Sequence, residues 1–262
     1  MRLDSTSTNP LFSVIIPIRD RSGMRLENCL RSIRWQKFED DPSTDLDPTI
    51  EIVISDYGSG PEQARNIDAI AKRFEARVVR TQTDRVWNRS LVLNIGIRAA
   101  RGRYVLCTDA DMLFREDFFA SALMYFQQDA GSFICCRCHD LPESVPEQEW
   151  SVDDLPFLLS KATVRNLRGT GACQFARRTF FESVRGYDEG YKYWGSEDRD
   201  MLFRAERHGM TITRLDNQTA MFHQWHPTMR NDRWLRTRVN RWRYRLTKFF
   251  VVKNWSSWGV EQ

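Results

Sequence analysis

The 262-residue sequence lacks any uninterrupted apolar run of the roughly 18 residues that a membrane-spanning helix needs. Its first ten residues are polar and lack the apolar centre of a secretory signal peptide. Internal repeats and low-complexity tracts are also missing. The hydrophobic content of 41% is nevertheless enough for a full core. We therefore expect one sizeable globular domain, or one domain with an extension, and no spanning helix.

The six cysteines do not form a recognisable zinc motif. Residues 135–139 hold three of them beside a histidine, but no second pair of ligands follows at zinc spacing. The other three lie in apolar segments, which is typical of buried thiols: Cys29, Cys107 and Cys173. This cysteine usage favours a reduced, cytoplasmic protein.

Strand and helix patterns alternate through the first half of the chain. Apolar runs predict strands, and apolar residues at helical spacing predict helices. In chain order these are the strand Leu11–Ile18, the helix Leu26–Trp35, the strand Ile50–Ser55, the helix Glu62–Phe74, the strand Ala76–Arg80, a helix marked by Leu91, Ile95 and Ala99, and a strand from Tyr104. This alternation predicts an α/β fold whose central sheet is mostly parallel, with right-handed crossovers.

The second half is less regular. The patterns predict, in chain order, a helix over Glu116–Gln127, a strand over Ser132–Cys138, a loop over Asp140–Asp154, a turn at Arg168–Gly171 and a helix that begins at an N-cap, Ser196, and ends at His208. An acidic, proline-containing loop is also expected in the first half, over Glu39–Thr49.

The most informative motif is Asp109-Ala110-Asp111, which ends the apolar run from Tyr104. Side chains alternate along a strand, so the two carboxylates can point the same way at its carboxyl end. Ligands of open α/β sheets bind at that end, and two carboxylates there suit a hard divalent cation that holds a phosphate. The alternative is a surface turn with two solvated aspartates, because Asp-x-Asp alone is a weak signal.

Polar residues also follow or begin other predicted elements. Residues 17–21 follow the first strand, Asp56 follows the second, and residues 193–198 open a late helix. Ends of neighbouring parallel strands converge on one crevice. A nucleotide could lie there with its base near Asp56 and its diphosphate over the metal.

Together these segments resemble metal-dependent glycosyltransferases of the GT-A fold. The N-terminal half resembles family 2, and the C-terminal half is similar to the β-1,4-galactosyltransferase and bacterial chondroitin-polymerase type. The matching segments are 16–21, 87–96, 108–111, 186–189 and 194–198. The resemblance implies transfer of a sugar from a nucleotide-sugar, expected to be a UDP-sugar, to the hydroxyl of a carbohydrate or other acceptor.

The resemblance also implies donor-binding roles. Asp56 would hydrogen-bond the uracil edge, and Arg89 would approach the diphosphate or the donor sugar. Asp109 would bind the donor sugar or ribose. The remaining residues of the expected donor site would line the nucleotide-sugar: Pro17, Ile18, Arg19, Arg21 and Ala110.

In the same resemblance, Asp111 would ligate the metal, and Asp109 would sometimes reach it through water. A downstream histidine would complete the site. His223 is the better match because it ends an apolar segment, and His226 is a second candidate. A set of carboxylate and imidazole ligands suits Mn²⁺ better than Ca²⁺ or Mg²⁺ alone, with Mg²⁺ as the alternative cofactor. The other interpretation is that both histidines lie in a surface loop without a ligand.

Asp198 is the candidate general base of an inverting transfer, because a carboxylate must take the proton of the attacking hydroxyl. Glu197 would bind the acceptor or rigidify the loop. Trp194 and Gly195 would also contact the acceptor, the tryptophan as a sugar-stacking platform. Ser196 departs from the family pattern, which usually has glycine there. The alternatives are that both acids only cap a helix, or that the enzyme is a retaining one that needs no base.

The last segment is strongly basic. Residues 230–248 hold eight Lys or Arg and one Asp, a local charge of +7 in a chain of net charge +4. We divide the chain into a catalytic domain, 1–228, and a helical extension, 229–262. Five apolar residues of the extension fall on one helical face: Leu235, Val239, Trp242, Leu246 and Phe249.

A basic amphipathic helix of this kind can lie on an anionic membrane, a nucleic acid or an acidic partner. The protein would then be peripheral to the membrane, or would be a non-catalytic binding protein. The alternative, slightly favoured, is that the apolar stripe packs on the catalytic domain while the arginines stay in solvent.

Overall fold

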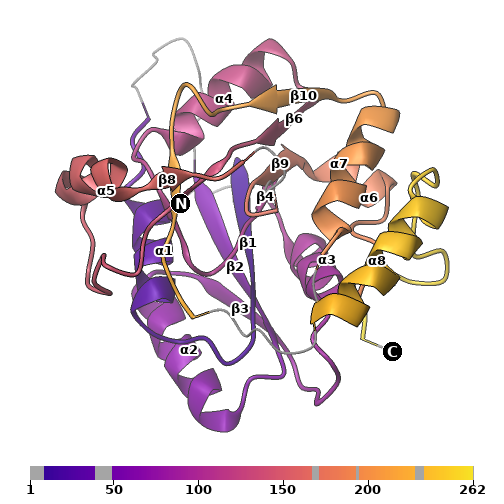
Figure 1. Ribbon diagram of the computed structural model, residues 1–262, viewed down its shortest axis with the longest axis horizontal. Helices are drawn as coiled ribbons and strands as arrows, with labels where there is room; N and C mark the ends of the chain where they lie inside the picture. The colour runs from indigo at the N-terminus through magenta and orange to yellow at the C-terminus, as the bar shows by residue number, and fades with distance from the viewer. Residues whose placement is uncertain (1–8, 39–48, 167–170, 193–194, 228–232, 262) are drawn as a thin grey trace, which may run out of the picture.

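The computed structural model describes residues 9–38, 49–166, 171–192, 195–227 and 233–261, with side chains of the last range from residue 238. The acidic loop expected at Glu39–Thr49 and the turn expected at Arg168–Gly171 lie almost wholly outside these residues. The chain forms a central sheet covered by helices on both faces (Figure 1). Among the described residues, no helix combines the length and apolar composition required to cross a bilayer.

The central sheet has seven strands in the order β10-β6-β9-β4-β1-β2-β3. Their bounds are β1 Phe12–Ile18, β2 Ile50–Tyr57, β3 Arg77–Thr81, β4 Tyr104–Cys107, β6 Ser132–Cys135, β9 Gln174–Arg177 and β10 Thr211–Arg214. The four strands of the first half run parallel to one another, and β10 runs parallel to β6. Strand β9 lies between β4 and β6 and is antiparallel to both. The expected α/β fold with a mostly parallel sheet is confirmed.

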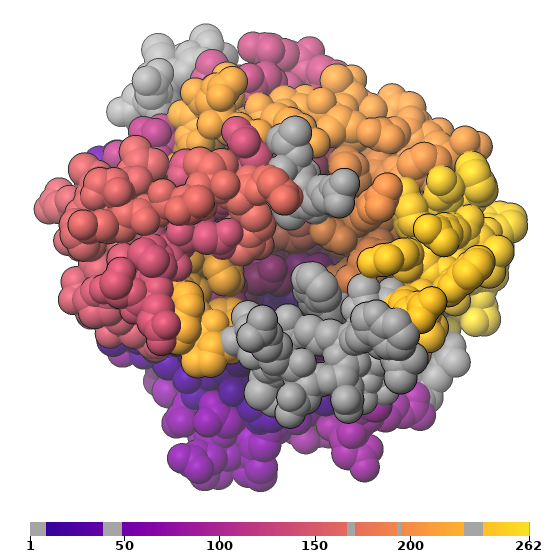
Figure 2. Space-filling view, viewed as in Figure 1, coloured from indigo at the N-terminus to yellow at the C-terminus, as the bar shows by residue number. Residues whose placement is uncertain are grey.

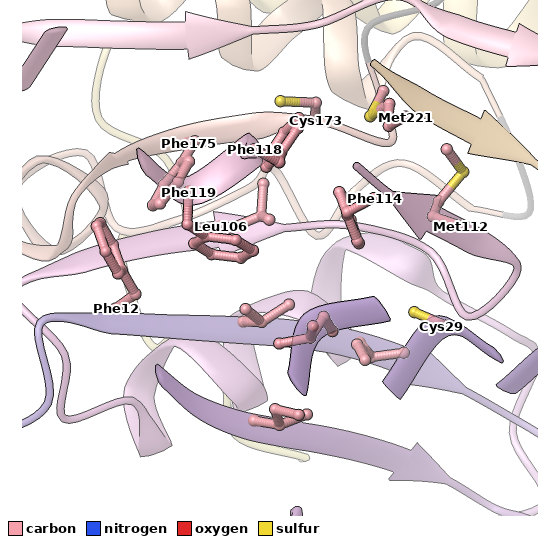
Figure 3. Packing of buried hydrophobic residues seen from close by; sticks show 14 of the residues in the cluster. Phe12, Cys29, Leu106, Met112, Phe114, Phe118, Phe119, Cys173, Phe175 and Met221 are labelled. Carbon is pink, nitrogen blue, oxygen red and sulfur yellow. The ribbon is translucent and has the colours of Figure 1, made fainter. Parts of the chain in front are cut away.

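Two layers of helices cover the sheet. Helices α1 Met24–Arg34, α2 Pro61–Arg73 and α4 Phe118–Gln128 pack against one face, and α3 Arg89–Ala99, α6 Arg178–Ser183 and α7 Glu197–Arg207 against the other. Alternation along β1 explains both layers, because Phe12 and Val14 face one core and Ile15 faces the other. Figure 3 shows the first core, which contains Leu106 and the rings of Phe12, Phe119 and Phe175, packed edge to face on one another.

A second, four-stranded sheet has the order β5-β11-β7-β8. Its strands are β5 Met112–Phe114, β7 Cys138–Asp140, β8 Thr163–Val164 and β11 Met221–His223. The strand expected over Ser132–Cys138 is therefore wrong in its extent: β6 ends at Cys135, and Cys138 begins β7 of the other sheet. The connection from β4 to β5 carries Asp109 and Asp111 from one sheet to the other. All six cysteines are free and buried, including Cys29, Cys107 and Cys173, for which burial was expected.

The basic segment forms α8 Arg233–Thr247, which lies on the outside beside α6 and α7 (Figure 1). The expectation that its apolar stripe faces the core is wrong. Val239, Trp242 and Leu246 are 68%, 59% and 69% exposed, whereas Asn240 and Tyr244 are buried. The face of α8 that contacts the rest of the domain does so largely through hydrogen bonds and ion pairs. The spacing of hydrophobic residues could therefore not identify this face. The side chain of Leu235 lies outside the described residues.

Candidate active site

Asp109 and Asp111 lie in a turn between β4 and β5 and not in a strand. The expectation that alternation along a strand aligns the two carboxylates is therefore wrong. Thr108 anchors the turn by donating its Oγ1 hydrogen to the carbonyl of Ala172 at 2.8 Å. The two aspartates meet different partners, which gives them different chemistry.

Asp111 lies in a cluster with two histidines. Its Oδ2 is 3.1 Å from His226 Nε2 and 3.9 Å from His223 Nε2. One ligand atom from each of the three residues lies within 4.8 Å of the others. The other carboxylate oxygen of Asp111, Oδ1, is buried and has no hydrogen-bond partner among the residues that the structure describes. A bound cation would satisfy this orphaned acceptor.

In each imidazole ring, Nδ1 lies near an oxygen acceptor that can fix the orientation of the ring. His223 Nδ1 lies 3.2 Å from Asp140 Oδ1, and His226 Nδ1 lies 3.1 Å from the carbonyl of Pro227. An oxygen acceptor beside Nδ1 favours a proton there, so that Nε2 would be the nitrogen that binds a metal. Asp140 is itself held by the guanidinium of Arg165, whose Nε donates at 2.9 Å. The donor set of one carboxylate and two imidazoles fits a first-row divalent metal.

The charges of the cluster are tightly linked. Burial alone would raise the pKa of Asp111, but the hydrogen bond from His226 and the nearby charges of His223 and Arg21 hold it below its usual value. The hydrogen bond to Asp111 raises the pKa of His226. Burial lowers the pKa of His223 and favours its neutral, metal-binding form. Arg21, which we predicted to line the nucleotide, donates to Asp111 Oδ2 at 3.3 Å.

Asp109 does not join the histidines. Its Oδ1 accepts two hydrogen bonds from Arg89, at 3.0 Å from Nε and 2.8 Å from Nη2. Arg89 is buried and also donates to the carbonyl of Gly171 at 3.0 Å. Burial opposes its charge, but the carboxylates of Asp109 and Glu197 raise the pKa of Arg89 overall. The guanidinium thus bonds the Asp-Ala-Asp turn and interacts electrostatically with Glu197 at the start of α7.

Two acids open α7. Burial raises the pKa of Glu197 to about 7, with the charge of Asp198 adding to the effect and that of Arg89 opposing it. Burial also raises the pKa of Asp198. Glu197 accepts a hydrogen bond from the backbone of Gly195 at 2.8 Å, which ties down the preceding loop. The more exposed Asp198 remains available to a reacting hydroxyl.

Ser196 precedes these acids but does not cap the helix with its side chain, contrary to our expectation. Its φ of 79° places it in the left-handed region, where a side chain adds strain. This conformation explains why glycine suits the position. Trp194, the expected stacking platform, lies outside the described residues.

The backbone around Asp198 is held by Gln174 and Tyr187, a role that the sequence patterns did not assign to them. Gln174 donates its Nε2 hydrogen to the carbonyl of Asp198 at 2.8 Å and accepts from the hydroxyl of Tyr187 at 2.6 Å. A Cβ on Gly171 would come within 3.3 Å of the Asp198 carboxylate. Glycine therefore leaves Asp198 room that a larger residue would take.

The expected base-binding residues lie at the carboxyl ends of β1 and β2. Asp56 belongs to β2 and is fully buried, so our placement of it after the strand was wrong. Its Oδ2 accepts from Arg80 at 2.7 Å, while Oδ1 has no hydrogen-bond partner within the described part of the chain. Arg19 lies over the ring of Tyr57 at 4.9 Å and that of Trp87 at 5.8 Å.

The remaining expected donor residues occupy the same region. Pro17 and Ile18 end β1, with Ile18 opposite Asp56 in the register. Ala110 is buried in the first core. The space-filling view shows a hollow near the centre of this face, with atoms from the first half of the chain at its bottom (Figure 2).

The fold defines the class of the protein. The GalNAc-T7 structure with UDP, GalNAc and Mn²⁺ matches with a TM-score of 0.60 and 16% identity over 84% of this chain and 45% of that one. The S. aureus TarS 1–349 structure in complex with UDP matches with a TM-score of 0.57 and 16% identity over 82% and 61%. At this identity the likeness shows the fold, which is the GT-A fold of glycosyltransferases.

The sequence comparison narrows this class to a family. The model of glycosyl transferase family 2 matches residues 13–185, and the chain belongs to this family. A second model, described as the N-terminal domain of galactosyltransferase, matches residues 161–227. The two matches confirm the resemblance that the motifs indicated.

Curated relatives are distant and longer. Chondroitin synthase of Escherichia coli is 23% identical over 70% of this chain and 31% of its own length. Validoxylamine A glucosyltransferase of Streptomyces hygroscopicus subsp. limoneus is 23% identical over 80% of this chain and 51% of its own length. The chain thus spans about half or less of the length of these relatives.

Proposed function

We propose that this protein is a metal-dependent glycosyltransferase that moves a sugar from a UDP-sugar to an acceptor hydroxyl with inversion. The observation that carries the proposal is the cluster of Asp111, His223 and His226, with its orphaned carboxylate oxygen. Asp111 is two residues from Asp109, and Arg89, which bonds Asp109, interacts electrostatically with Glu197 of α7. A metal site, a cation beside it and a pair of raised-pKa acids are the groups that such a transfer needs.

Asp111, His223 and His226 would hold the metal, and Mn²⁺ fits their mixed oxygen and nitrogen donors best. When bound, this metal would supply positive charge that neutralises the leaving diphosphate. The GalNAc-T7 structure, which shares the fold, contains Mn²⁺ and UDP, and this supports the assignment. Mg²⁺ is the alternative cofactor.

The donor nucleotide would lie along the ends of β1 and β2. The buried Oδ1 of Asp56 can accept the imide hydrogen of uracil, and none of the described residues hydrogen-bonds that atom. Arg19, Tyr57 and Trp87 would line the nucleotide beside Asp56. Pro17, Ile18 and Ala110 would shape the rest of this site, and Arg21 would add charge near Asp111. The TarS complex with UDP supports a uridine nucleotide.

Arg89 would act next to the donor sugar or its diphosphate. It is buried, and it keeps its charge because Asp109 and Glu197 raise its pKa. Asp109 is half-exposed, so one oxygen can bond Arg89 while the other reaches a sugar or ribose hydroxyl. Asp109 would sometimes also reach the metal through a water molecule.

Asp198 would serve as the general base. It would take the proton of the acceptor hydroxyl while that oxygen attacks the anomeric carbon, and the bond from this carbon to the diphosphate oxygen would break. Glu197 would hold the loop through Gly195 and lie beside the acceptor. Gly195 and Trp194 would contact the acceptor. A retaining transferase, which needs no base, is the alternative; the raised pKa of Asp198 favours the inverting assignment.

A screen of UDP- and GDP-sugars for hydrolysis and transfer in the presence of Mn²⁺ tests this function. We expect at least one UDP-sugar to be consumed, and NMR of the product should show an anomeric configuration opposite to that of the donor. A product with the same anomeric configuration as the donor would show that the enzyme is a retaining transferase and not an inverting one. Failure to bind UDP or consume any sugar nucleotide would contradict the proposed function.

A further inference from the structure

Helix α8 exposes a continuous apolar stripe. Val239, Trp242 and Leu246 follow one another at spacings of three and four residues, and each is more than half exposed. These three side chains extend for about 10 Å along the helix axis. After the helix ends, Phe249, Phe250 and Trp255 are also exposed, at 56%, 59% and 73%, and the Phe249 ring contacts that of Phe203 on one side. We call these six residues the apolar stripe.

Basic side chains lie next to the apolar stripe. Arg241 and Arg245 are exposed, and the Arg245 guanidinium lies 5.6 Å from the centre of the Trp242 ring. The segment 233–260 holds eight Lys or Arg and no Asp or Glu. The outward side of α8 is therefore apolar along one strip and positive along the neighbouring one.

The inward side of α8 is fixed to the domain by polar contacts. Asn240 donates to the carbonyl of Lys192 at 2.8 Å, and Arg243 donates two hydrogen bonds to the buried carboxylate of Asp188, at 3.0 and 2.6 Å. Tyr244 packs against the ring of Phe203. These contacts occupy a different face of α8 from Val239, Trp242 and Leu246, so the helix cannot turn these three side chains inward without losing them.

We propose that α8 docks the protein onto an anionic lipid bilayer, with the apolar stripe in the interface and the arginines against lipid phosphates. Helices that lie in the interface combine an apolar strip with Lys and Arg in this way. Tryptophan and phenylalanine suit the level of the lipid headgroups. The aliphatic Val239 and Leu246 favour lipid over nucleic acid, because they offer no stacking surface for a base. This proposal does not rest on the proposed catalytic function.

Flotation with lipid vesicles tests the electrostatic part. The wild-type chain should bind vesicles of phosphatidylcholine that contain about one third phosphatidylglycerol, and should bind pure phosphatidylcholine far more weakly. Replacement of Arg241 and Arg245 by Gln should weaken binding about 30-fold, from roughly a factor of five for each charge near the surface. The matched control, Arg65→Gln with Lys72→Gln on α2, removes the same charge elsewhere and should change binding little.

A second pair of variants tests the apolar part. Trp242→Ser with Leu246→Ser should abolish flotation, whereas Met124→Ser with Leu159→Ser, also exposed but away from α8, should not. Thermal unfolding of each variant checks that folding is intact. The proposal is overturned if the wild type does not bind anionic vesicles, or if the serine pair binds them as the wild type does. It is also overturned if a DNA duplex displaces the vesicles, or if the stripe is covered in a stable dimer that vesicles do not disperse.

Discussion

Asp140 and His223 are partners in the register of the parallel strands β7 and β11, and the Asp140 carboxylate lies 3.2 Å from His223 Nδ1. The second sheet therefore fixes which nitrogen of His223 faces Asp111. Carboxylates in this position hold the tautomer and the orientation of a metal-binding histidine. Asp140 is thus a positioning residue of the proposed metal site, although it would not touch the metal.

Replacement of Asp140 by Ala should weaken Mn²⁺ binding about 10- to 100-fold, the usual effect of losing a residue that orients a ligand. Calorimetric titration of Mn²⁺ in the presence of UDP measures the loss. Asp140→Asn should recover most of the affinity, because its side-chain oxygen still accepts from Nδ1. Unchanged affinity in the alanine variant would show that His223 does not depend on Asp140.

Replacement of Asp198 by Asn keeps the shape of the side chain but removes the proton acceptor. Transfer should fall by roughly 100-fold or more, as general-base loss typically does. UDP affinity should hardly change, because the metal and nucleotide contacts come from other residues. Steady-state kinetics with a UDP binding titration separate the two effects. Near-normal transfer by this variant would favour the retaining mechanism.

Glu197 should make the stability of the protein depend on pH. Its folded-state pKa is raised from 4.5 to about 7, so a proton on Glu197 stabilises the fold. This contribution is complete below about pH 4.5 and is lost as the pH rises through about 7. Glu197→Gln removes the titration but keeps an acceptor for Gly195. At about pH 8 the variant should therefore be more stable than the wild type, by roughly 1–3 kcal/mol.

Denaturant unfolding of the wild type and of Glu197→Gln at about pH 5 and about pH 8 measures this difference. Glu182→Gln, at an exposed carboxyl in an i, i+4 ion pair, is the matched control and should leave the pH dependence unchanged. If Glu197→Gln loses as much stability as the wild type between about pH 5 and about pH 8, a group other than Glu197 is responsible for the pH dependence.

Replacement of Asp56 by Ala should weaken UDP binding and reduce the preference for uracil over cytosine, because the acceptor of the imide hydrogen is lost. Asp68→Ala is the control: Asp68 is the other carboxylate bound to Arg80, at 2.8 Å. It removes an ion pair of the same arginine without touching the buried Oδ1 of Asp56. If both variants bind UDP like the wild type, Asp56 serves only to hold Arg80.

Much of the fold could be predicted because strands that are buried on both faces appear in the sequence as continuous apolar runs. The runs that became β1 and β4 are buried on both faces, so nearly every residue in them is apolar. Strand β9 was not predicted, since Gln174–Arg177 is short and begins and ends with polar residues. Its place in the sheet comes from pairing with β4 and β6, which no local pattern reveals.

In the candidate site, too, local motifs predicted some residues, whereas long-range pairing determined others. Asp111 and the two histidines lie together as the motifs indicated, but Asp140 was missed because its role depends on long-range pairing of β7 with β11. In α8 the spacing correctly placed Trp242 and Leu246 on one face. Which face docks depends on partners such as Asp188, and these cannot be inferred from periodicity.

The most direct test of the central claim is the effect of Mn²⁺ on UDP binding, measured as the shift in melting temperature. UDP with Mn²⁺ should raise the melting temperature of the wild type, by linkage, and EDTA should remove most of that rise. In Asp111→Ala the protein should remain folded and show no Mn²⁺-dependent rise. An equal UDP-dependent rise in EDTA and in Mn²⁺, or a wild-type response in Asp111→Ala, would contradict the proposed metal site.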